Sequence, residues 1–436
     1  MGFRHVGRAG RDSSAGEPAG GAPLRCSWKF GPVLAAVLVV MSGCSAASGS
    51  PALHVGAIYP TGGGQGEGGL EEWHGVQLAA ELANRRHLVD GGIQLDLAPV
   101  SSAEGAPAAV RSVFAKGARI VLGTYGSTIS RKVAEVASSK GMLFWETGAV
   151  GQLMTEVPLA GDRVFRFAPT GQTLGTSAID FIEKVVKPKL GEQNLNYSIA
   201  YVDDVYGRSV GLGAEARAKE IGIEPTMFPY DASLKDFAPL ARAVAAAHTD
   251  VLVVSAYLRD GVSLRKALVD ERVPLRASIG TSSSYCMEDF GRQLGPRAVG
   301  LFASDKPDAG ALDAARLSRP AADAFRFASK EYRERWHEPM PAPALAGFSA
   351  AWALFDHVIP AAKSMRPAQV ARAAMSMDLP IGSLPNAAGM RFVRGDSGSL
   401  VNVDATHVIW EWVKPNTRAV VWPPEFAKHD VTVLPI

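Results

Sequence analysis

Apolar positions in the first part of the chain follow two periods. The runs Leu53–Ile58 and Ala118–Leu122 are continuous or alternating and predict strands, whereas Trp73–Ala83 has the apolar spacing of one helix face. Strands that alternate with helices of this length predict a parallel sheet covered on both faces. The same patterns predict further elements, strands at 93–97 and 142–145 and helices at 106–116 and 130–140.

The alternation starts again after Phe167–Pro169 and continues to Ile279, which predicts a second unit of similar size. Its expected strands and helices lie at 175–186, 198–202, 210–221, 226–229, 237–247, 250–255, 261–270 and 277–279. Beyond them, long amphipathic helices are expected at 321–336, 344–362 and 370–377, and a β-ribbon with a Gly-rich turn at 390–413.

This order predicts an α/β protein with two doubly wound lobes and a hinge that the chain crosses several times. We expect lobe 1 to contain 53–168 and 305–378, and lobe 2 to contain 169–304 and 379–436. The predicted hinge segments are Phe167–Pro169, Ser304–Pro307 and Leu379–Gly382. Two such lobes form a cleft, because open α/β sheets bind ligands at the carboxyl ends of their strands.

The N-terminus carries a different signal. Basic residues precede the short apolar run Gly31–Val40, which is followed by Met41-Ser42-Gly43-Cys44. This arrangement resembles a bacterial lipoprotein signal, in which cleavage before Cys44 leaves a lipid-modified cysteine. It predicts a signal peptide at 1–43 and a tether at 44–52; an ordinary secretory signal that contains a cysteine is the alternative.

Charge and cysteine content narrow the class of protein. Residues 1–43 carry a net charge of +3 and the whole chain +2, so the remainder is about −1 and offers no basic face for nucleic acid. Of the three cysteines, Cys26 lies in the predicted signal and Cys44 would carry lipid, which leaves Cys286 without a disulfide partner. No second membrane-spanning stretch is expected after the signal.

Two short motifs are weak evidence for nucleotide binding or for catalysis. The G-x-G-x-x-G at 64–69 follows a strand but lacks a tight turn, so we expect a flexible loop above the cleft rather than a nucleotide site. The G-x-S-x-G at 207–211 places Ser209 too far from its strand for a nucleophile elbow. Histidines are scattered and no metal-ligand spacing occurs, so neither metal nor cofactor is expected.

The loops at predicted strand ends carry small, hydroxyl and aromatic residues that suit a small polar ligand. Ser127 and Thr128 coincide with a helix start, where free N–H groups favour an anion such as a carboxylate, although simple N-capping explains them equally well. The other candidates at strand ends are Glu146, Gly148, Ala149, Tyr206, Tyr257 and Ser282.

From these residues the chain resembles the type I periplasmic binding proteins of the leucine/isoleucine/valine-binding family, the receptor subunits of ABC importers. The resemblance is carried in order by motifs spread over 53–413: Val55-Gly56-Ala57, Pro60-Thr61-Gly62, Val121-Leu122-Gly123, Phe165-Arg166, Asp204-Val205-Tyr206-Gly207 and Asp236-Phe237.

The resemblance implies roles for several positions. It implies that Ser127 and the backbone at Gly148 hold a ligand's α-carboxylate, and that Val150, Tyr206 and Tyr257 line the site. Ser282 stands where the family commonly has an acid for the α-ammonium, which puts an ordinary amino acid in doubt.

One acid could compensate for the serine. We hypothesise that Glu146 and Trp145, with Tyr206 or Tyr257, accept a cationic group by charge and cation–π contact. In the alternative, Trp145 packs in the core, and Glu146 is solvated or paired with an arginine.

These expectations combine into a monomeric, lipid-anchored receptor on the extracytoplasmic face of the cell membrane. It would bind a small polar molecule, such as an amino acid, an amide or a urea-like compound, and deliver it to ABC permease subunits without chemistry of its own. A ligand-sensing receptor of the same fold and an extracellular enzyme are the alternatives.

Overall fold

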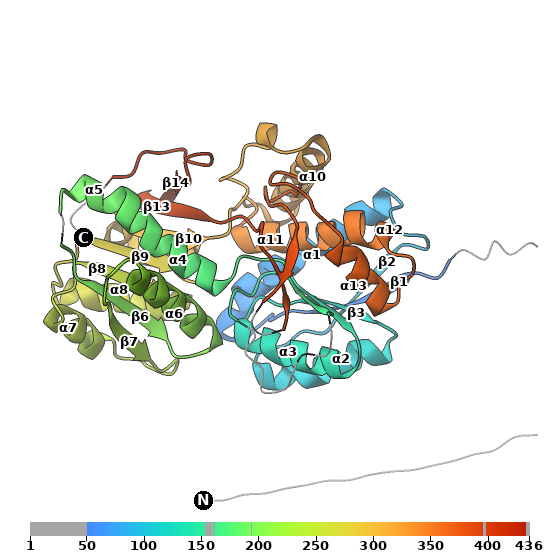
Figure 1. Cartoon of the computed structure of the whole chain (residues 1–436), viewed down its shortest axis with the longest axis horizontal. Coiled ribbons are helices and arrows are strands. Elements are labelled where there is room, and N and C mark those ends of the chain that lie inside the picture. Colours follow the sequence, from blue (N-terminus) through green and yellow to red (C-terminus); the bar gives the residue numbers. More distant parts are fainter. Residues whose placement is uncertain (1–49, 153–158, 160–161, 193, 396–397, 433–436) are drawn as a thin grey trace, which may run out of the picture. The chain divides into compact units, whose positions relative to one another are not determined.

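The computed structural model describes residues 50–152, 159, 162–192, 194–395 and 398–432, which belong to the compact unit Gly49–Ile436. Cys44 and the predicted signal lie outside the described residues. The unit contains two seven-stranded sheets with helices on both faces (Figure 1), so the predicted two-lobed α/β class is confirmed.

The first sheet has the order β11-β12-β5-β4-β3-β1-β2, and all neighbouring strands are parallel except β11 and β12. Its strands are β1 (Leu53–Ile58), β2 (Ile93–Leu97), β3 (Ile120–Gly123), β4 (Leu143–Glu146), β5 (Val164–Arg166), β11 (Phe392–Arg394) and β12 (Leu400–Asn402). The helices of this lobe are α1 (Gly66–Arg85), α2 (Ala106–Ala115), α3 (Ser127–Ser139), α10 (Arg319–Trp336), α11 (Ala342–Trp352), α12 (Ile359–Ala361) and α13 (Pro367–Met375).

The second sheet has the order β14-β13-β10-β9-β8-β6-β7, in which β13 runs antiparallel to both of its neighbours, β10 and β14. Its strands are β6 (Tyr197–Val202), β7 (Thr226–Tyr230), β8 (Val251–Ser255), β9 (Ala277–Thr281), β10 (Phe302–Asp305), β13 (Val408–Lys414) and β14 (Thr417–Trp422). Its helices are α4 (Gly171–Phe181), α5 (Lys187–Leu190), α6 (Val205–Glu220), α7 (Ala238–Ala246), α8 (Leu258–Asp270) and α9 (Glu288–Leu294).

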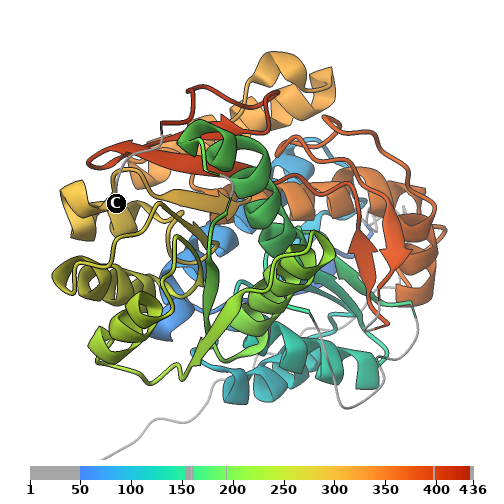
Figure 2. The ribbon, with the colours of Figure 1, turned by 60° about the vertical axis from the view of Figure 1, so that its left-hand side comes forward.

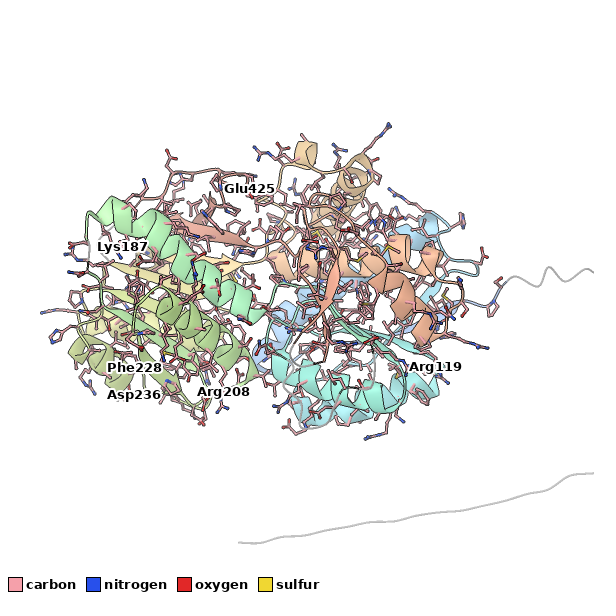
Figure 3. All side chains as sticks on the ribbon, viewed as in Figure 1. Arg119, Lys187, Arg208, Phe228, Asp236 and Glu425 are labelled. Atoms are coloured by element: carbon pink, nitrogen blue, oxygen red, sulfur yellow. The ribbon has the colours of Figure 1, made fainter. Side chains whose placement is uncertain are left out.

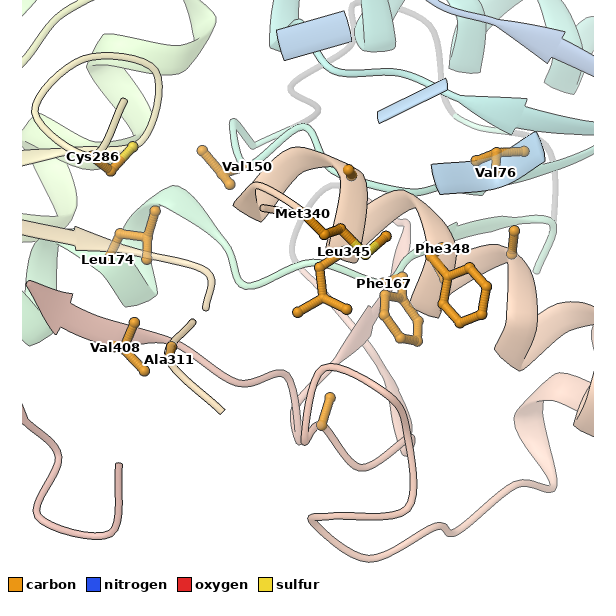
Figure 4. Close-up of a cluster of buried hydrophobic side chains, with 14 of the residues drawn as sticks. Val76, Val150, Phe167, Leu174, Cys286, Ala311, Met340, Leu345, Phe348 and Val408 are labelled. Atoms are coloured by element: carbon orange, nitrogen blue, oxygen red, sulfur yellow. The ribbon is translucent and has the colours of Figure 1, made fainter. Parts of the chain in front are cut away.

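Alternating side chains give each strand two buried faces. In β4, Phe144 packs in the cluster formed by α2 and α3, whereas Leu143 and Trp145 pack on the opposite face in the cluster that contains α1 and α11. Val76 of α1 and Phe348 of α11 belong to this second cluster (Figure 4).

The second sheet follows the same rule. Ile199 and Tyr201 pack with α4 and α6, and both views show these helices along one face of the sheet (Figures 1 and 2). Ala200 and Val202 face the other side, toward the apolar residues of α7, α8 and α9. Burial on both faces explains why these strands are almost continuously apolar in sequence.

The chain passes between the two sheets after β5, after β10 and after β12. The first two passages coincide with the predicted segments Phe167–Pro169 and Ser304–Pro307. The third differs from the prediction at Leu379–Gly382: Leu379 pairs with Met390, and β11 and β12 then join the first sheet. The chain actually passes to the second lobe at 403–407. Residues 379–402 therefore belong to lobe 1, and their predicted place in lobe 2 is wrong.

The difference arises because the predicted ribbon 390–413 is really two hairpins that join different sheets. Asn402 ties the first hairpin to lobe 1, since its amide donates to the carbonyl oxygens of Gly389 at 3.0 Å and Phe167 at 3.4 Å. A five-residue gap then leads to β13 in the other lobe.

Contrary to expectation, one later segment is long and apolar enough to cross a membrane by length and composition. This segment, Ala342–Ala361, is 83% buried inside the protein, which is typical of a core helix. All residues of α11 are buried, because the helix packs between α1 and the rest of the lobe.

Close packing of α1 on α11 depends on glycine. A Cβ atom at Gly75 would lie 1.9 Å from the carbonyl oxygen of Ala344, and one at Gly347 would lie 2.3 Å from the carbonyl oxygen of Glu72. Both obstacles are backbone atoms, so they cannot move without shifting a helix. The two helices therefore approach each other at a distance that only glycine permits.

We expect Gly75→Ala to lower the free energy of unfolding by about 1–3 kcal/mol, because overpacking at a helix contact forces backbone shifts. Urea unfolding followed by circular dichroism measures the change. Gly64→Ala is the matched control, since no atom lies within 4 Å of a Cβ there. Equal loss of stability in both variants would contradict this account of the contact.

Candidate functional site

A small cavity of ≈ 10 Å³, which has room for about one water molecule, lies where the two lobes meet. It is lined by loop and helix-start residues of both lobes: Gln65, Tyr125, Gly126, Ser127, Gly148, Val150, Tyr206, Tyr257, Ser282 and Ser283. These residues follow β1, β3 and β4 in one lobe and β6, β8 and β9 in the other. The cavity thus lies at the carboxyl ends of both parallel sheets.

Strand order explains this position. In the first sheet, β1 lies between β2 and β3, and in the second, β6 lies between β7 and β8. Connections leave such a central pair toward opposite faces, which opens a crevice at the strand ends. The lining residues Gln65 and Tyr125 come from the first crevice, and Tyr206 and Tyr257 come from the second.

The first lobe contributes the start of α3. Gly126 is the N-cap residue and Ser127 is the first helical residue, so neither Ser127 nor Thr128 caps the helix with its side chain. The Ser127 hydroxyl accepts a hydrogen bond from the Gly151 amide at 2.9 Å, which leaves its own proton available to the cavity. The first-turn N–H groups add positive potential there.

The second lobe contributes two tyrosines and the loop after β9. The rings of Tyr206 and Tyr257 lie 5.3 Å apart. The hydroxyl of Tyr206 contacts Thr281 at 2.9 Å and donates to the Ser282 carbonyl, and that of Tyr257 donates to Asp204 at 2.6 Å. Both hydroxyls are therefore engaged within the lobe, and the ring faces are left to the cavity.

Lys306 joins the two sides of the cavity. It follows β10 in the second chain passage and is only 2% exposed. Its ammonium donates to the Gly148 carbonyl at 3.2 Å and to the Ser282 hydroxyl at 3.5 Å, and it lies 3.5 Å from Asp305. Burial lowers the pKa of Lys306, but the negative charges of Asp305 and Glu72 outweigh burial and raise it.

The loop after β4 is fixed by two buried polar side chains, Glu146 and Arg166. The Glu146 carboxylate accepts hydrogen bonds from the amides of Gly148, at 2.8 Å, and Ala149. Arg166 donates to the Val150 carbonyl at 2.8 Å, and its Nε lies 4.0 Å from Glu146. The backbone amide of Gly148, expected to hold a ligand, is instead taken by Glu146.

These positions correct the hypothesis that Glu146 and Trp145 accept a cation in the cleft. Both are fully buried, and the indole donates to the Ala350 carbonyl at 2.9 Å and stacks on Phe165. Trp145 shares a strand face with Leu143, and this face looks toward α11 rather than the cleft. The alternative, a core tryptophan and a glutamate beside an arginine, is what the structure shows.

Two further candidates lie beside the cavity rather than on it. Ala149 is buried behind the lining, where its carbonyl accepts from Arg166 at 3.4 Å. Thr128 lines a separate outer groove together with Arg208, which Figure 3 labels. The predicted residues that the structure brings together at the cavity are Ser127, Gly148, Val150, Tyr206, Tyr257 and Ser282.

A buried carboxyl group supports the cavity wall from behind. Glu72 of α1 accepts a hydrogen bond from the Thr147 hydroxyl, which also contacts the Tyr59 hydroxyl at 2.8 Å. A Cβ atom at Gly148 would lie 2.0 Å from Glu72, so the wall requires glycine here. Burial raises the pKa of Glu72 to about 7, and burial raises that of Glu146 to about 8.

The two short motifs have structural explanations. The glycines at 66, 68 and 69 open α1, and a Cβ at Gly68 would lie 2.4 Å from the Tyr125 ring. The motif is thus a helix start packed against the cavity wall and not the flexible loop that was expected. Ser209 lies within α6, where its hydroxyl accepts from the Gln152 amide at 3.0 Å, and Asp204 caps that helix.

Sequence reasoning missed Gln65, Tyr125, Ser283 and Lys306 as site residues. Tyr125 follows β3 directly, and its hydroxyl meets Ser283 of the other lobe at 3.0 Å. A tyrosine between the glycines of a strand-end loop was the available signal. Lys306 lay in a predicted hinge segment, but its contacts depend on residues more than 20 positions away.

Comparison with known proteins identifies the family. The sequence profile described as "Periplasmic binding protein" matches residues 52–402, most of the chain. The chain belongs to the periplasmic binding protein family. This membership confirms the predicted resemblance and accounts for two lobes that share one cavity.

The names of related proteins agree with this family assignment. Leu/Ile/Val-binding protein homolog 8 of Brucella abortus (strain 2308) is 24% identical over 364 residues, covering 82% of this chain and 87% of the relative. Homolog 7 of Brucella suis is 24% identical over 266 residues, or 59% of this chain and 65% of that relative. These relatives are binding proteins by name and not enzymes.

Solved structures share the fold of this periplasmic binding protein. The leucine-binding protein LivK of Thermotoga maritima has a TM-score of 0.68 at 15% identity, covering 86% of this chain and 99% of that one. A solute-binding protein of R. palustris in complex with benzoate has a TM-score of 0.66 at 16% identity, covering 85% and 95%.

The raised pKa of Glu72 predicts a pH dependence of stability. The folded protein holds this proton up to about pH 7, whereas an unfolded glutamate loses it near 4.5. The stabilisation is therefore complete below pH 4.5 and lost as the pH rises through 7. Between pH 5 and pH 8, the unfolding free energy of the native protein should fall by about 2–3 kcal/mol more than that of Glu72→Gln.

Urea unfolding at both pH values measures this difference. Glu224→Gln, at a site that is 82% exposed, is the matched control and should retain the native pH dependence. If Glu72→Gln and the native protein had the same pH dependence, the carboxyl group would not be protonated in the folded state.

Proposed function

We propose that this chain is the extracytoplasmic substrate-binding subunit of an ABC importer and that it binds a small carboxylate-containing molecule in the cavity between its lobes. The observation that carries the proposal is the cavity itself, whose lining comes from strand-end loops of both lobes. A ligand held there contacts both lobes at once, so binding favours the conformation in which they meet.

Direct contacts between the lobes support a closing motion. Tyr125 contacts Ser283 at 3.0 Å, and the Gln152 amide donates to Ser209 at 3.0 Å. The chain passages at 167–169, 304–307 and 403–407 are the segments about which the lobes would rotate. Closure of a monomer around its ligand would create the surface that permease subunits recognise.

The names of relatives guide the choice of ligand class. One structural neighbour, LivJ of Streptococcus pneumoniae, was solved with isoleucine, and the R. palustris protein was solved with benzoate. Both ligands carry a carboxylate. In this chain, the Ser127 hydroxyl and the N-terminus of α3 could donate hydrogen bonds to such a carboxylate.

We also propose that Cys44 is the site of lipid attachment, which would hold the protein at the outer face of the cell membrane. Cys44 lies outside the described residues, so this proposal rests on the sequence around it. Two or more acyl chains anchor a protein stably without a membrane-spanning helix.

A screen of the purified protein by thermal shift tests the binding function. Amino acids, amides and small organic acids form the panel, and a ligand present at 100 times its Kd stabilises the folded state by about 2.7 kcal/mol. Ser127→Ala should weaken binding of the active compound at least tenfold, since a hydrogen bond to a charged group contributes about 1.5–3 kcal/mol.

Thr128→Val is the matched control for this experiment, because Thr128 is the next residue but lines the outer groove. It should leave the affinity unchanged. Ser127→Ala with undiminished affinity would show that the ligand binds elsewhere.

The lipid proposal is tested separately. Cys44→Ser should lose incorporation of a clickable palmitate analogue and release the protein from the membrane fraction of the producing cells. Cys26→Ser is the control, because Cys26 lies in the predicted signal and should not affect labelling. Labelling that persists in Cys44→Ser would disprove the assignment.

A further inference from the structure

A second, larger hollow lies beside the cavity. It is the outer groove, which measures ≈ 750 Å³, a volume typical of pockets that hold small molecules. Its walls come from α3 and Gln152 in lobe 1 and from Gln172 and α6 in lobe 2. Because α3 and α6 contact each other across the lobe boundary (Figure 1), a molecule that fills the groove contacts both lobes.

The two acids on the groove already receive hydrogen bonds from the protein. The guanidinium of Arg208 donates to both carboxylate oxygens of Asp203. Asp204 accepts the Gly207 amide at 2.9 Å with one oxygen and the Tyr257 hydroxyl at 2.6 Å with the other. Neither carboxylate therefore depends on a ligand for a donor.

The second cation on the groove, Arg131, has no such partner. It lies one turn after Ser127 on α3 and is half-buried. In the part of the chain that the structure describes, its Nε is buried without a hydrogen-bond partner, and no carboxylate forms an ion pair with the guanidinium. A guanidinium that is partly withdrawn from water without an acceptor is an exception among buried polar groups and calls for a partner.

An oxyanion is the partner that this group fits. Carboxylates and phosphates accept two parallel hydrogen bonds from the planar fork of an arginine. The rest of the groove suits an organic body, because Leu212 is 49% exposed there and the side-chain amides of Gln152 and Gln172 meet at 3.3 Å across the lobe boundary.

A short backbone segment separates the groove from the cavity. The Gly151 amide donates to Ser127 of the cavity at 2.9 Å, and the Gln152 amide donates to Ser209 of the groove at 3.0 Å. A Cβ atom at Gly151 would lie 2.6 Å from the Ser127 side chain and 2.9 Å from the Val205 carbonyl oxygen, so the segment fits tightly between α3 and α6. The two hollows are thus neighbours with a common wall.

We propose that the outer groove is a second ligand site, which binds an organic oxyanion through Arg131. The anion contacts Arg131 in lobe 1 and α6 in lobe 2, so its binding favours the conformation in which the two helices meet. This site goes beyond the proposed function, because it does not require a ligand in the cavity.

Three probes with the same body test the site at pH 7: 2-naphthoate, 2-naphthyl phosphate and 2-naphthamide. Only the head group differs between them, and the naphthalene body is far too large for a cavity of ≈ 10 Å³. Isothermal titration of the purified protein should give a Kd at least tenfold lower for one or both anions than for the amide. The difference between the two anions tells whether the groove prefers a carboxylate or a phosphate.

Arg131→Met should weaken anion binding about tenfold, the loss expected when a hydrogen bond to a charged group is removed, and change amide binding less than threefold. Arg111→Met, at an exposed arginine of α2 in the same lobe, is the matched control and should bind as the native protein does. Ser127→Ala should also retain the anion affinity, because Ser127 lines the cavity and not the groove. If Arg131→Met does not fold, the three probes on the native protein and on Ser127→Ala still decide the question.

Several results would overturn the proposal. They are equal affinity for the anions and the amide, binding of neither anion, and anion binding that is unchanged in Arg131→Met. A loss in Ser127→Ala as large as in Arg131→Met would place the anion in the cavity and overturn it as well. None of these results contradicts ligand binding in the cavity, which the thermal-shift screen tests separately.

Discussion

The cavity depends on two buried polar side chains inside the first lobe, Glu146 and Arg166. Glu146 and Arg166 hold the loop after β4 from two sides, one through amide groups and the other through carbonyl groups. Removal of either side chain leaves buried backbone groups of the loop without their hydrogen-bond partners, which typically costs about 1–3 kcal/mol. The pair therefore does more than stabilise the lobe: it sets the direction of the Gly148 carbonyl, and this carbonyl positions Lys306.

Through this chain of contacts the ligand cavity is connected to the hinge. Lys306 belongs to the second passage between the lobes, yet its ammonium is bound to the loop after β4 and to the loop after β9. A ligand that contacts this ammonium therefore interacts with both lobes and with the connection between them. In the proposed function, this side chain would couple ligand binding to closure of the lobes.

The sequence predicted the architecture well because the architecture rests on local periodicity. Continuous apolar strands such as Val251–Ser255 and amphipathic helices between them predict a parallel sheet, and the sheet places strand-end residues such as Ser127 and Tyr206 at one edge. The positions of those loops follow from topology alone. This is why several candidate residues converge in the structure.

The errors share one physical origin, which is that long-range packing leaves little local signal. β4 is buried on both faces, so nothing in its sequence tells which face Trp145 occupies. Lys306 after an apolar strand looks like a solvent-exposed residue, because its burial depends on loops far away in the chain. The hairpin of β11 and β12 has the composition of an edge element, and its pairing with β5 and the contacts of Asn402 assign it to the first sheet.

The glycine contact between α1 and α11 has a consequence for how the protein is made. α1 is among the first elements to be synthesised and α11 follows more than 250 residues later, so this face of the first sheet lacks part of its cover until α11 has been made. The second lobe has its five parallel strands, β6–β10, and its helices α4–α9 in one continuous segment and has no such delay. Incomplete lobes with exposed apolar faces aggregate readily. The final third of the chain therefore determines when the first lobe can finish folding.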